Sequence, residues 1–285
     1  MKKSLGVLSS FISLVRPKQW LKNALLFFPP FFAVKIGDPA VKSALVPAFF
    51  SFALMSSCSY ILNDIRDRET DKNHHIKRKR PLASGKVSVL QASFLAGVVY
   101  FASILIGSAV SEKFEALLII YLVISFLYSF FLKQMALIDI FVVSFGFMIR
   151  VIAGGVAFHV EVSKWLFLTV FLVSLLLASG KRLGELIDLG EGAATHRKSL
   201  VNYSQGFLGG LLWFSAAASL ITYALYTLER TTTLFYTVPL VAFGIIRYNY
   251  LAMKGTGEPT DVLVRDMPIM VTGLLWVASI GILIY

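Results

Sequence analysis

Cysteine is almost absent from this chain of 285 residues, and charged residues are scarce. The single cysteine, Cys58, lies inside an apolar stretch, so the sequence offers neither a disulfide framework nor a cysteine-based metal site. Free cysteine is usually buried, and we expect Cys58 to be a small core residue. Only 15% of the residues are charged, whereas 57% are hydrophobic. The mean hydropathy of +0.75 exceeds what a soluble domain of this length needs and predicts a polytopic membrane protein.

Apolar windows long enough to cross a bilayer recur along the chain. We therefore expect an all-α bundle of about nine transmembrane helices around a central cavity, in a single domain over residues 1–285. The first expected span is short and is interrupted by Pro29 and Pro30. The lysine-rich start lacks a small-residue cleavage site, so we do not expect a removed signal peptide. The nine expected spans cover residues 21–36, 44–62, 88–110, 114–132, 136–157, 164–180, 206–228, 233–251 and 267–285.

Basic residues outnumber acidic ones by 27 to 16, which gives a net charge of +11. In a membrane protein such charge usually sets orientation and contacts anionic lipid, so we expect no nucleic acid partner. The lysines and arginines gather on one side of the expected spans, which the positive-inside rule makes cytosolic. The N-terminus, the cavity mouth and the two long polar loops, residues 63–87 and 181–205, should then face the cytosol from the cell (inner) membrane. A reaction there would join a soluble substrate to a lipid, and a homo-oligomer is left open.

The most informative stretch is acidic and directly follows the second expected span. Asp64, Asp67 and Asp71 are spaced i, i+3, i+7, so on a helix their carboxylates share one face. Three like charges on one face repel each other. Binding of Mg²⁺ offsets this cost, because Mg²⁺ is usually held by a few carboxylates together with substrate phosphates. The competing interpretation is a solvated helix end whose acids pair with nearby arginines.

Cationic residues follow these acids, among them Lys77 and Arg80. Such a run serves either as a topology signal or as an anion site. Ser84 and Gly85, which come next, would let backbone donors approach a phosphate. Acids that hold a metal, followed by bases that hold phosphate, indicate a diphosphate substrate.

A second polar motif begins at the end of the sixth expected span. Lys181 and Glu185 could simply pair at i, i+4 on a helix. The cationic start of the motif, Lys181 and Arg182, instead favours binding of a second anion. Arg197 and Lys198 add two more cations in the same loop, which could also be merely solvated.

Other polar residues lie before or within the expected spans. Lys18, Lys22 and Asn23 precede or begin the first span, where lysines also suit membrane topology. Ionisable groups inside a membrane are functional hypotheses by default. Asp139 and Arg150 are three helical turns apart in the fifth span and could line one cavity. The same argument selects two residues near the end of the fourth span, Tyr128 and Lys133.

The pattern Asn63-Asp64-x-x-Asp67-x-x-x-Asp71 at the end of an apolar span resembles the first signature of the UbiA superfamily of intramembrane prenyltransferases. Ordinary members carry a second aspartate-rich motif, but Lys181-Arg182-x-x-Glu185 stands in its place here. With the polar stretches 16–23, 77–81 and 197–199, the chain looks like the phosphoribosyltransferase branch of that superfamily. Its members move phosphoribose from phosphoribosyl diphosphate (PRPP) onto decaprenyl phosphate.

The resemblance implies a magnesium-dependent glycosyltransferase that contributes an arabinan precursor to cell wall biosynthesis. It assigns catalysis and metal binding to Asp64, Asp67 and Asp71. The substrates would be PRPP and a polyprenyl phosphate. The residues expected to bind them are Lys18, Lys22, Asn23, Asn63, Lys77, Arg80, Tyr128, Lys133, Arg150, Lys181, Arg182, Glu185, Arg197 and Lys198.

Two alternatives from other classes stay open. A UbiA-type prenyltransferase would move a prenyl group from prenyl diphosphate to a small or aromatic acceptor, and the missing second acidic motif argues against it. An ion-coupled transporter would use Asp139 and Arg150 as intramembrane ion or proton sites. The long cytosolic loops with metal-type acids argue against that reading.

Overall fold

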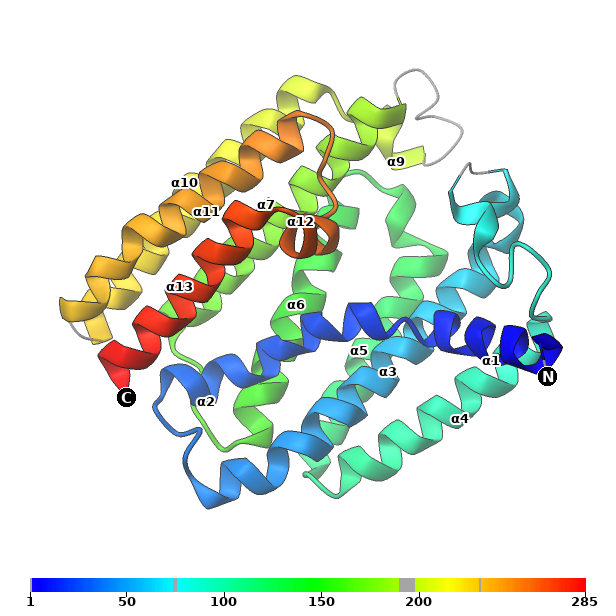
Figure 1. The fold of residues 1–285 in the computed structure, drawn as a ribbon, viewed down its shortest axis with the longest axis horizontal. Helices are drawn as coiled ribbons and strands as arrows, with labels where there is room; N and C mark the ends of the chain where they lie inside the picture. The colour runs from blue at the N-terminus through cyan, green and yellow to red at the C-terminus, as the bar shows by residue number, and fades with distance from the viewer. Residues whose placement is uncertain (1, 74–75, 190–197, 231) are drawn as a thin grey trace. The chain divides into compact units, whose positions relative to one another are not determined.

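The computed structural model describes residues 2–73, 76–189, 198–230 and 232–285, and every regular element among them is helical (Figure 1). This confirms the all-α class. The α-helices are α1 (Lys2–Val15), α2 (Phe28–Phe32), α3 (Pro39–Lys72), α4 (Val89–Ser108), α5 (Glu112–Phe130), α6 (Ile138–Ala157), α7 (Lys164–Leu189), α9 (Lys198–Val201), α10 (Gln205–Arg230), α11 (Val238–Met253), α12 (Pro259–Arg265) and α13 (Met267–Ile284). The 3₁₀ helices are η1 (Pro17–Phe27), η2 (Lys77–Lys79), η3 (Leu132–Gln134) and η5 (Thr232–Thr237).

Within these described residues, eight helices are long and apolar enough to cross a membrane, and they match the second to ninth expected spans. The first expected span, residues 21–36, does not form one long helix. It is folded as the end of η1, the five-residue α2 and a turn. Pro29 and Pro30 in α2 lack backbone N–H donors, so an uninterrupted α-helix through this segment would lose hydrogen bonds. The number of nine spans therefore stays a prediction.

Serine and aspartate side chains fix where several of the long helices begin. Each accepts a hydrogen bond from a backbone N–H in the first turn of its helix, which would otherwise lack a partner. At α4 the interaction is reciprocal, because the Gln91 side chain also accepts from the backbone N–H of Ser88. The capping residues are Ser88, Ser111, Ser163, Ser204 and Asp266.

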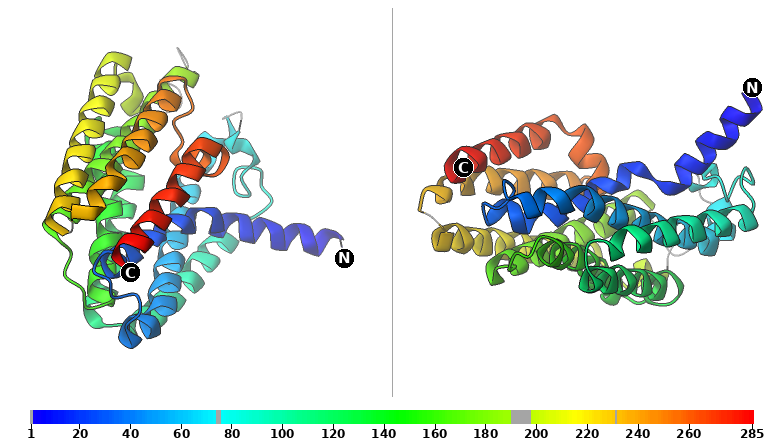
Figure 2. Two further views of the ribbon diagram at one scale, coloured as in Figure 1. Left: turned by 60° about the vertical axis from the view of Figure 1, so that its left-hand side comes forward. Right: turned by 90° about the horizontal axis from the view of Figure 1, so that it is seen from below.

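The described chain forms two compact units. Unit 1 comprises Met1–Lys133 and Ile149–Glu161, and unit 2 comprises Gln134–Met148 and Val162–Tyr285. In unit 1, α3 packs against α1, η1, α4 and α5, and the chain changes direction between α1 and η1 in the right-hand view of Figure 2. In unit 2, α10 and α11 run alongside α7, and α13 packs against α11 (Figure 1). The expectation of one domain over residues 1–285 stays a prediction.

Each unit contains one of the two polar motifs on a long helix. α3 of unit 1 continues past the expected end of its span at residue 62, so the first acidic motif lies on the same helix. α7 of unit 2 likewise continues past residue 180 through the second motif to Leu189. Both motifs are thus held on rigid helices that are anchored in apolar packing.

Candidate active site

The first acidic motif is helical, as its spacing predicted. Asp64 and Asp71 lie on the buried side of α3, with exposed fractions of 2% and 5%, and Asp67 is half-buried. Asn63 precedes them on α3 and is also half-buried. Buried carboxylates are costly unless they are paired, so the cations around them decide what this site can bind.

Two arginines meet these acids inside unit 1. Arg16 Nη2 lies 2.5 Å from Oδ1 of Asp64. Arg80 Nη1 lies 3.1 Å from the same oxygen and 2.6 Å from Oδ2 of Asp71. Arg16 adopts a left-handed backbone conformation, with φ of 54°, immediately before Pro17. This conformation is uncommon for a non-glycine residue. Arg16 links α1 to η1, and its ion pair with Asp64 ties it to α3.

The acids of α3 suit a divalent cation by their chemistry. One guanidinium nitrogen of Arg80 contacts both Asp64 and Asp71, so two carboxylate oxygens already converge on a single cationic position. Mg²⁺ needs only one or two protein carboxylates when substrate phosphates complete its coordination. Among the described residues, no group of three histidine, cysteine, aspartate or glutamate side chains is close enough to hold a metal by itself. The residues therefore fit a metal that arrives with a phosphorylated ligand.

Asp67 pairs with a different cation. Its carboxylate accepts a hydrogen bond from Lys133, which lies in η3. The structure thus brings Lys133 to the acidic motif from 66 residues away. Tyr128, in the last turns of α5, and Lys77, in η2, are half-buried and make further polar or ring contacts.

A second polar group in unit 1 surrounds Arg150 of α6. Its Nε donates a hydrogen bond to Oδ1 of Asn23 at 2.9 Å, and its Nη2 donates to the hydroxyl of Tyr121 at 3.0 Å. The guanidinium also lies over the rings of Tyr121 and Phe52, at 4.8 and 5.3 Å from their centroids. Asn23 and Arg150, both selected from sequence, are therefore direct partners, and both are buried.

A glycine makes this contact geometrically feasible. A Cβ atom at Gly154 would lie 2.0 Å from the carbonyl oxygen of Leu26, so only glycine lets η1 approach α6 this closely. Arg150 lies one turn earlier on α6 and so faces Asn23 of η1.

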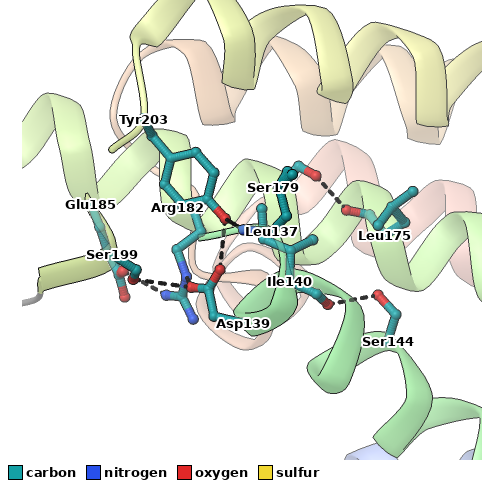
Figure 3. A network of polar contacts seen from close by, with 10 residues as sticks. All are labelled: Leu137, Asp139, Ile140, Ser144, Leu175, Ser179, Arg182, Glu185, Ser199 and Tyr203. Atoms are coloured by element: carbon teal, nitrogen blue, oxygen red, sulfur yellow. Dashed lines mark hydrogen bonds and ion pairs between the residues drawn. The ribbon is translucent and has the colours of Figure 1, made fainter. Parts of the chain in front are cut away.

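In unit 2, the guanidinium of Arg182 is buried against acids (Figure 3). Its Nε donates to Oδ2 of Asp139 at 2.8 Å, and its Nη1 donates to Oε2 of Glu185 at 2.6 Å. Tyr203 donates to Oδ1 of Asp139 at 2.7 Å, and Ser199 donates to Oδ2 at 3.3 Å. Burial and the hydrogen bond to this carboxylate raise the pKa of Tyr203, which keeps its hydroxyl a donor.

The contacts of Asp139 and Arg150 belong to two separate networks, and the expectation that they line one cavity stays a prediction. Asp139 belongs to unit 2 and binds Arg182, whereas Arg150 belongs to unit 1 and binds Asn23. Helical spacing placed them on one face of α6. Their hydrogen-bond partners, which lie far away in sequence, separate them into two networks.

Lys181 does not form the i, i+4 pair that was the alternative to anion binding, and its role in anion binding stays a prediction. Its ammonium lies 2.5 Å from Oε2 of Glu258, while Glu185 pairs with Arg182. The loop that carries Glu258 approaches α7 closely, because a Cβ at Gly257 would lie 2.1 Å from the carbonyl oxygen of Gly180. The i, i+4 pairing of Lys181 with Glu185 was therefore wrong.

The remaining cations selected from the sequence are placed by exposure or by backbone position. Lys18 is exposed on η1, and Lys22, on the same helix, is half-buried. Arg197 lies outside the described residues. The backbone of Lys198 begins α9, but its side chain is not among those described.

Sequence analysis assigned no role to three residues that complete these networks. Arg16 was visible only as a basic residue before a proline. Tyr121 and Tyr203 look like ordinary aromatic residues of a membrane protein, and no local signal marks them. Their roles depend on contacts across 29 to 64 residues of sequence.

Comparison with known proteins agrees with this architecture. Residues 24–264 match the model of the UbiA prenyltransferase family. The chain is 36% identical over 300 residues to decaprenyl-phosphate phosphoribosyltransferase of Mycolicibacterium smegmatis, covering 98% of this chain and 94% of that protein. It is 34% identical over 289 residues to the protein of the same name from Corynebacterium glutamicum, covering 96% of this chain and 86% of that protein.

Solved structures show the same fold. A UbiA homologue from Archaeoglobus fulgidus, solved with GPP and Mg²⁺ bound, superposes with a TM-score of 0.76 at 19% identity, covering 96% of this chain and 99% of that one. The family match covers most of the sequence, and the relatives match it almost from end to end. This multi-pass membrane protein therefore belongs to the UbiA prenyltransferase family.

Proposed function

We propose that this protein transfers 5-phosphoribosyl from PRPP to a polyprenyl phosphate of the decaprenyl type and releases diphosphate. Two relatives that match nearly the whole chain carry the name of this activity. The product would be a precursor of cell wall arabinan. The protein would be a magnesium-dependent glycosyltransferase of the cell membrane, with its N-terminus and active site on the cytosolic side.

The proposal rests on the basic residues that open the second motif. Lys181 and Arg182 stand on α7 where ordinary family members are expected to hold acids, and Arg182 is 3% exposed. A prenyltransferase brings one diphosphate to a neutral acceptor. Phosphoribosyl transfer to a lipid phosphate brings two further phosphates, the ribose 5-phosphate and the lipid headgroup. A cationic second motif suits those added phosphates.

Asp64, Asp67 and Asp71 would hold Mg²⁺, which when bound neutralises charge on the diphosphate of PRPP. Asn63 would orient that group from the same helix. Arg80 already contacts both Asp64 and Asp71 and is well placed to bind a diphosphate oxygen when those acids turn to the cation.

In the reaction, the bond between ribose C1 and the diphosphate oxygen breaks, and diphosphate leaves with the electron pair. The C1 centre gains oxocarbenium character, as in other glycosyl transfers. A lipid phosphate oxygen attacks from the opposite face and forms the new C–O bond with inversion. No strong general base is needed, because the attacking phosphate is already anionic. Cationic side chains that bind the departing diphosphate lower the barrier by stabilising its developing charge.

Lys181, Arg182 and Lys198 would bind the ribose 5-phosphate or the lipid phosphate. Arg150 and Asn23 would form a further polar group for substrate, together with Lys18, Lys22, Lys77, Tyr128 and Lys133. Glu185 would act through Arg182, with which it pairs. The lipid chain would extend into the bilayer between apolar helices.

Prenyl transfer is the alternative, because a solved structure of the same fold carries GPP. It predicts that a prenyl diphosphate is consumed and that PRPP is ignored. The acidic motif of α3 serves both reactions, so only the donor separates them.

The test incubates the purified protein in detergent with Mg²⁺, radiolabelled PRPP and a short polyprenyl phosphate, followed by extraction into organic solvent. Label in the lipid phase that disappears with EDTA supports the proposal. Asp67→Asn should lose transfer at low Mg²⁺, whereas Glu69→Gln, an exposed acid on the same helix, should retain it. Consumption of a prenyl diphosphate without lipid label from PRPP would refute the proposal.

A further inference from the structure

Asp139 is a fully buried acid to which neither the motifs nor the proposed reaction assigns a role. It lies in the first turn of α6 with 0% exposure. Its two carboxylate oxygens accept hydrogen bonds from three side chains, on α7, on α9 and in the residues that lead into α10 (Figure 3). An ionised carboxylate in such a place must be compensated, and the guanidinium of Arg182 supplies the opposite charge.

The geometry at Arg182 fixes more than charge. Asp139 holds its Nε, and Glu185 holds its Nη1, at 2.8 and 2.6 Å. A guanidinium is planar. Two acceptors on different nitrogens therefore fix the orientation of its plane and its rotation within that plane. Glu185 lies on the same helix as Arg182, so Asp139 is the partner that ties the guanidinium to α6.

The same carboxylate also holds the last part of the second polar loop. Ser199 donates to Oδ2 and Tyr203 donates to Oδ1. The Tyr203 hydroxyl also accepts a hydrogen bond from the backbone N–H of Leu137, whose φ is +66°. Lys198 immediately precedes Ser199 in the chain. Asp139 thus anchors the backbone that directly follows Lys198 in the sequence.

We propose that Asp139 is a positioning residue, which orients Arg182 toward one substrate phosphate and docks residues 199–203 against α6. This inference rests on the proposed function. Asp139 contacts protein donors rather than substrate, so it acts through Arg182. A residue that only stabilised the fold would not affect the affinity for one substrate more than for the other.

The first variant is Asp139→Asn, which keeps shape and hydrogen-bond acceptance but removes the charge. Initial rates are measured with PRPP and polyprenyl phosphate varied in turn. We expect the KM of one phosphorylated substrate to rise about 10- to 100-fold, the range typical of removing a partner that orients a ligand. The other KM and kcat should change less than about threefold, because lost ground-state binding appears in KM.

The matched control is Asp266→Asn. Asp266 also pairs with an arginine of unit 2, Arg247, at 2.9 Å, and it caps α13. Its loss should lower thermal stability in detergent and leave both KM values unchanged. Asp139→Asn and Asp266→Asn together thus separate positioning from general stabilisation.

A double variant covers the case in which Asp139→Asn folds poorly. Arg182→Gln alone leaves Asp139 without its opposite charge, whereas Asp139→Asn with Arg182→Gln removes both charges at once. We expect the double variant to regain the melting temperature lost in either single variant and to keep the raised KM. Tyr203→Phe, which retains the ring stacked on Phe207, should raise the same KM by a smaller factor.

Equal increases in both KM values, or unchanged KM values in well-folded Asp139→Asn, would overturn the positioning role. The transfer reaction would still stand if the unaltered protein labels lipid. Recovery of KM along with melting temperature in the double variant would also overturn it. If the unaltered protein neither labels lipid nor is stabilised by PRPP against heat, the proposed function falls, and the role of Asp139 falls with it.

Discussion

The Nε of Arg150 donates a 2.9 Å hydrogen bond to Oδ1 of Asn23, which lies 127 residues earlier in the chain. The acceptor is a neutral amide, and a second partner of Arg150 is the hydroxyl of Tyr121. Neither of these two partners is a carboxylate, so they leave the attraction of the guanidinium for an anion in place. This pairing suits a group that receives a phosphate better than one that only stabilises the fold.

Asn23→Asp places a carboxylate beside Arg150 without changing the size of the side chain. We expect the melting temperature in detergent to hold or rise and the KM of a phosphorylated substrate to increase about tenfold, because the new acid competes with the phosphate. Asn23→Ala should instead destabilise by about 1–3 kcal/mol, since Arg150 loses a buried acceptor. Substrate affinity unchanged in Asn23→Asp would exclude Arg150 from phosphate binding.

Arg80→Ala should strengthen metal binding in the absence of substrate. Arg80 Nη1 contacts both Asp64 and Asp71 and so competes with a metal ion for their carboxylates. The attraction between two opposite charges at about 4 Å is about 1 kcal/mol even in water. Removal of the guanidinium should therefore raise the affinity for a divalent cation by about fivefold or more. Electron paramagnetic resonance of free Mn²⁺ measures the affinity directly, without turnover. Lys72→Ala, which removes an exposed cation paired with Glu69, is the control and should change nothing. Weaker Mn²⁺ binding by Arg80→Ala would place the metal elsewhere.

Gly154→Ala should destabilise unit 1, because the new methyl group would meet the carbonyl oxygen of Leu26. Overpacking of this kind costs about 1–3 kcal/mol or more. Gly209→Ala, on α10, meets nothing within 4 Å and should be neutral or stabilising by up to about 1 kcal/mol. Thermal unfolding in detergent compares the two. A Gly154→Ala protein as stable as its Gly209→Ala counterpart would contradict the close approach of η1 to α6.

Cysteine labelling can test the predicted orientation, because the native Cys58 is buried and should not react with a membrane-impermeant maleimide. We expect Lys86→Cys to be labelled only when the cytosolic face is open, and Glu161→Cys to be labelled from the opposite face. Both positions lie outside the eight candidate spans. Labelling of both variants from the same side would refute the topology.

Local features were predictable from sequence, whereas partners were not. The i, i+3, i+7 spacing correctly placed Asp64, Asp67 and Asp71 on one helix, since helical periodicity is a property of neighbouring residues. The pairing of Lys181 with Glu185 failed because Glu258, 77 positions later in the sequence, is brought against α7 by close glycine packing. Periodicity carries no information about such long-range approaches.

The segment 21–36 shows a second limit of prediction from sequence. Its hydropathy is that of a span, but its two prolines remove backbone donors and the chain folds as η1 and α2. Hydropathy reports the solvent that a segment prefers and does not report the kind of helix it forms. The turn of η1 toward α6 is nevertheless what brings Asn23 to Arg150.

Arg16, Arg80 and Lys133 pair with Asp64, Asp71 and Asp67, which leaves the acidic motif of unit 1 matched charge for charge. Thermodynamic linkage follows from this balance. A metal ion that takes the acids releases the bases, and an anion that takes the bases releases the acids, so each ligand raises the affinity for the other by the same factor. Cation and diphosphate should consequently load as a cooperative pair, and either one alone should bind weakly.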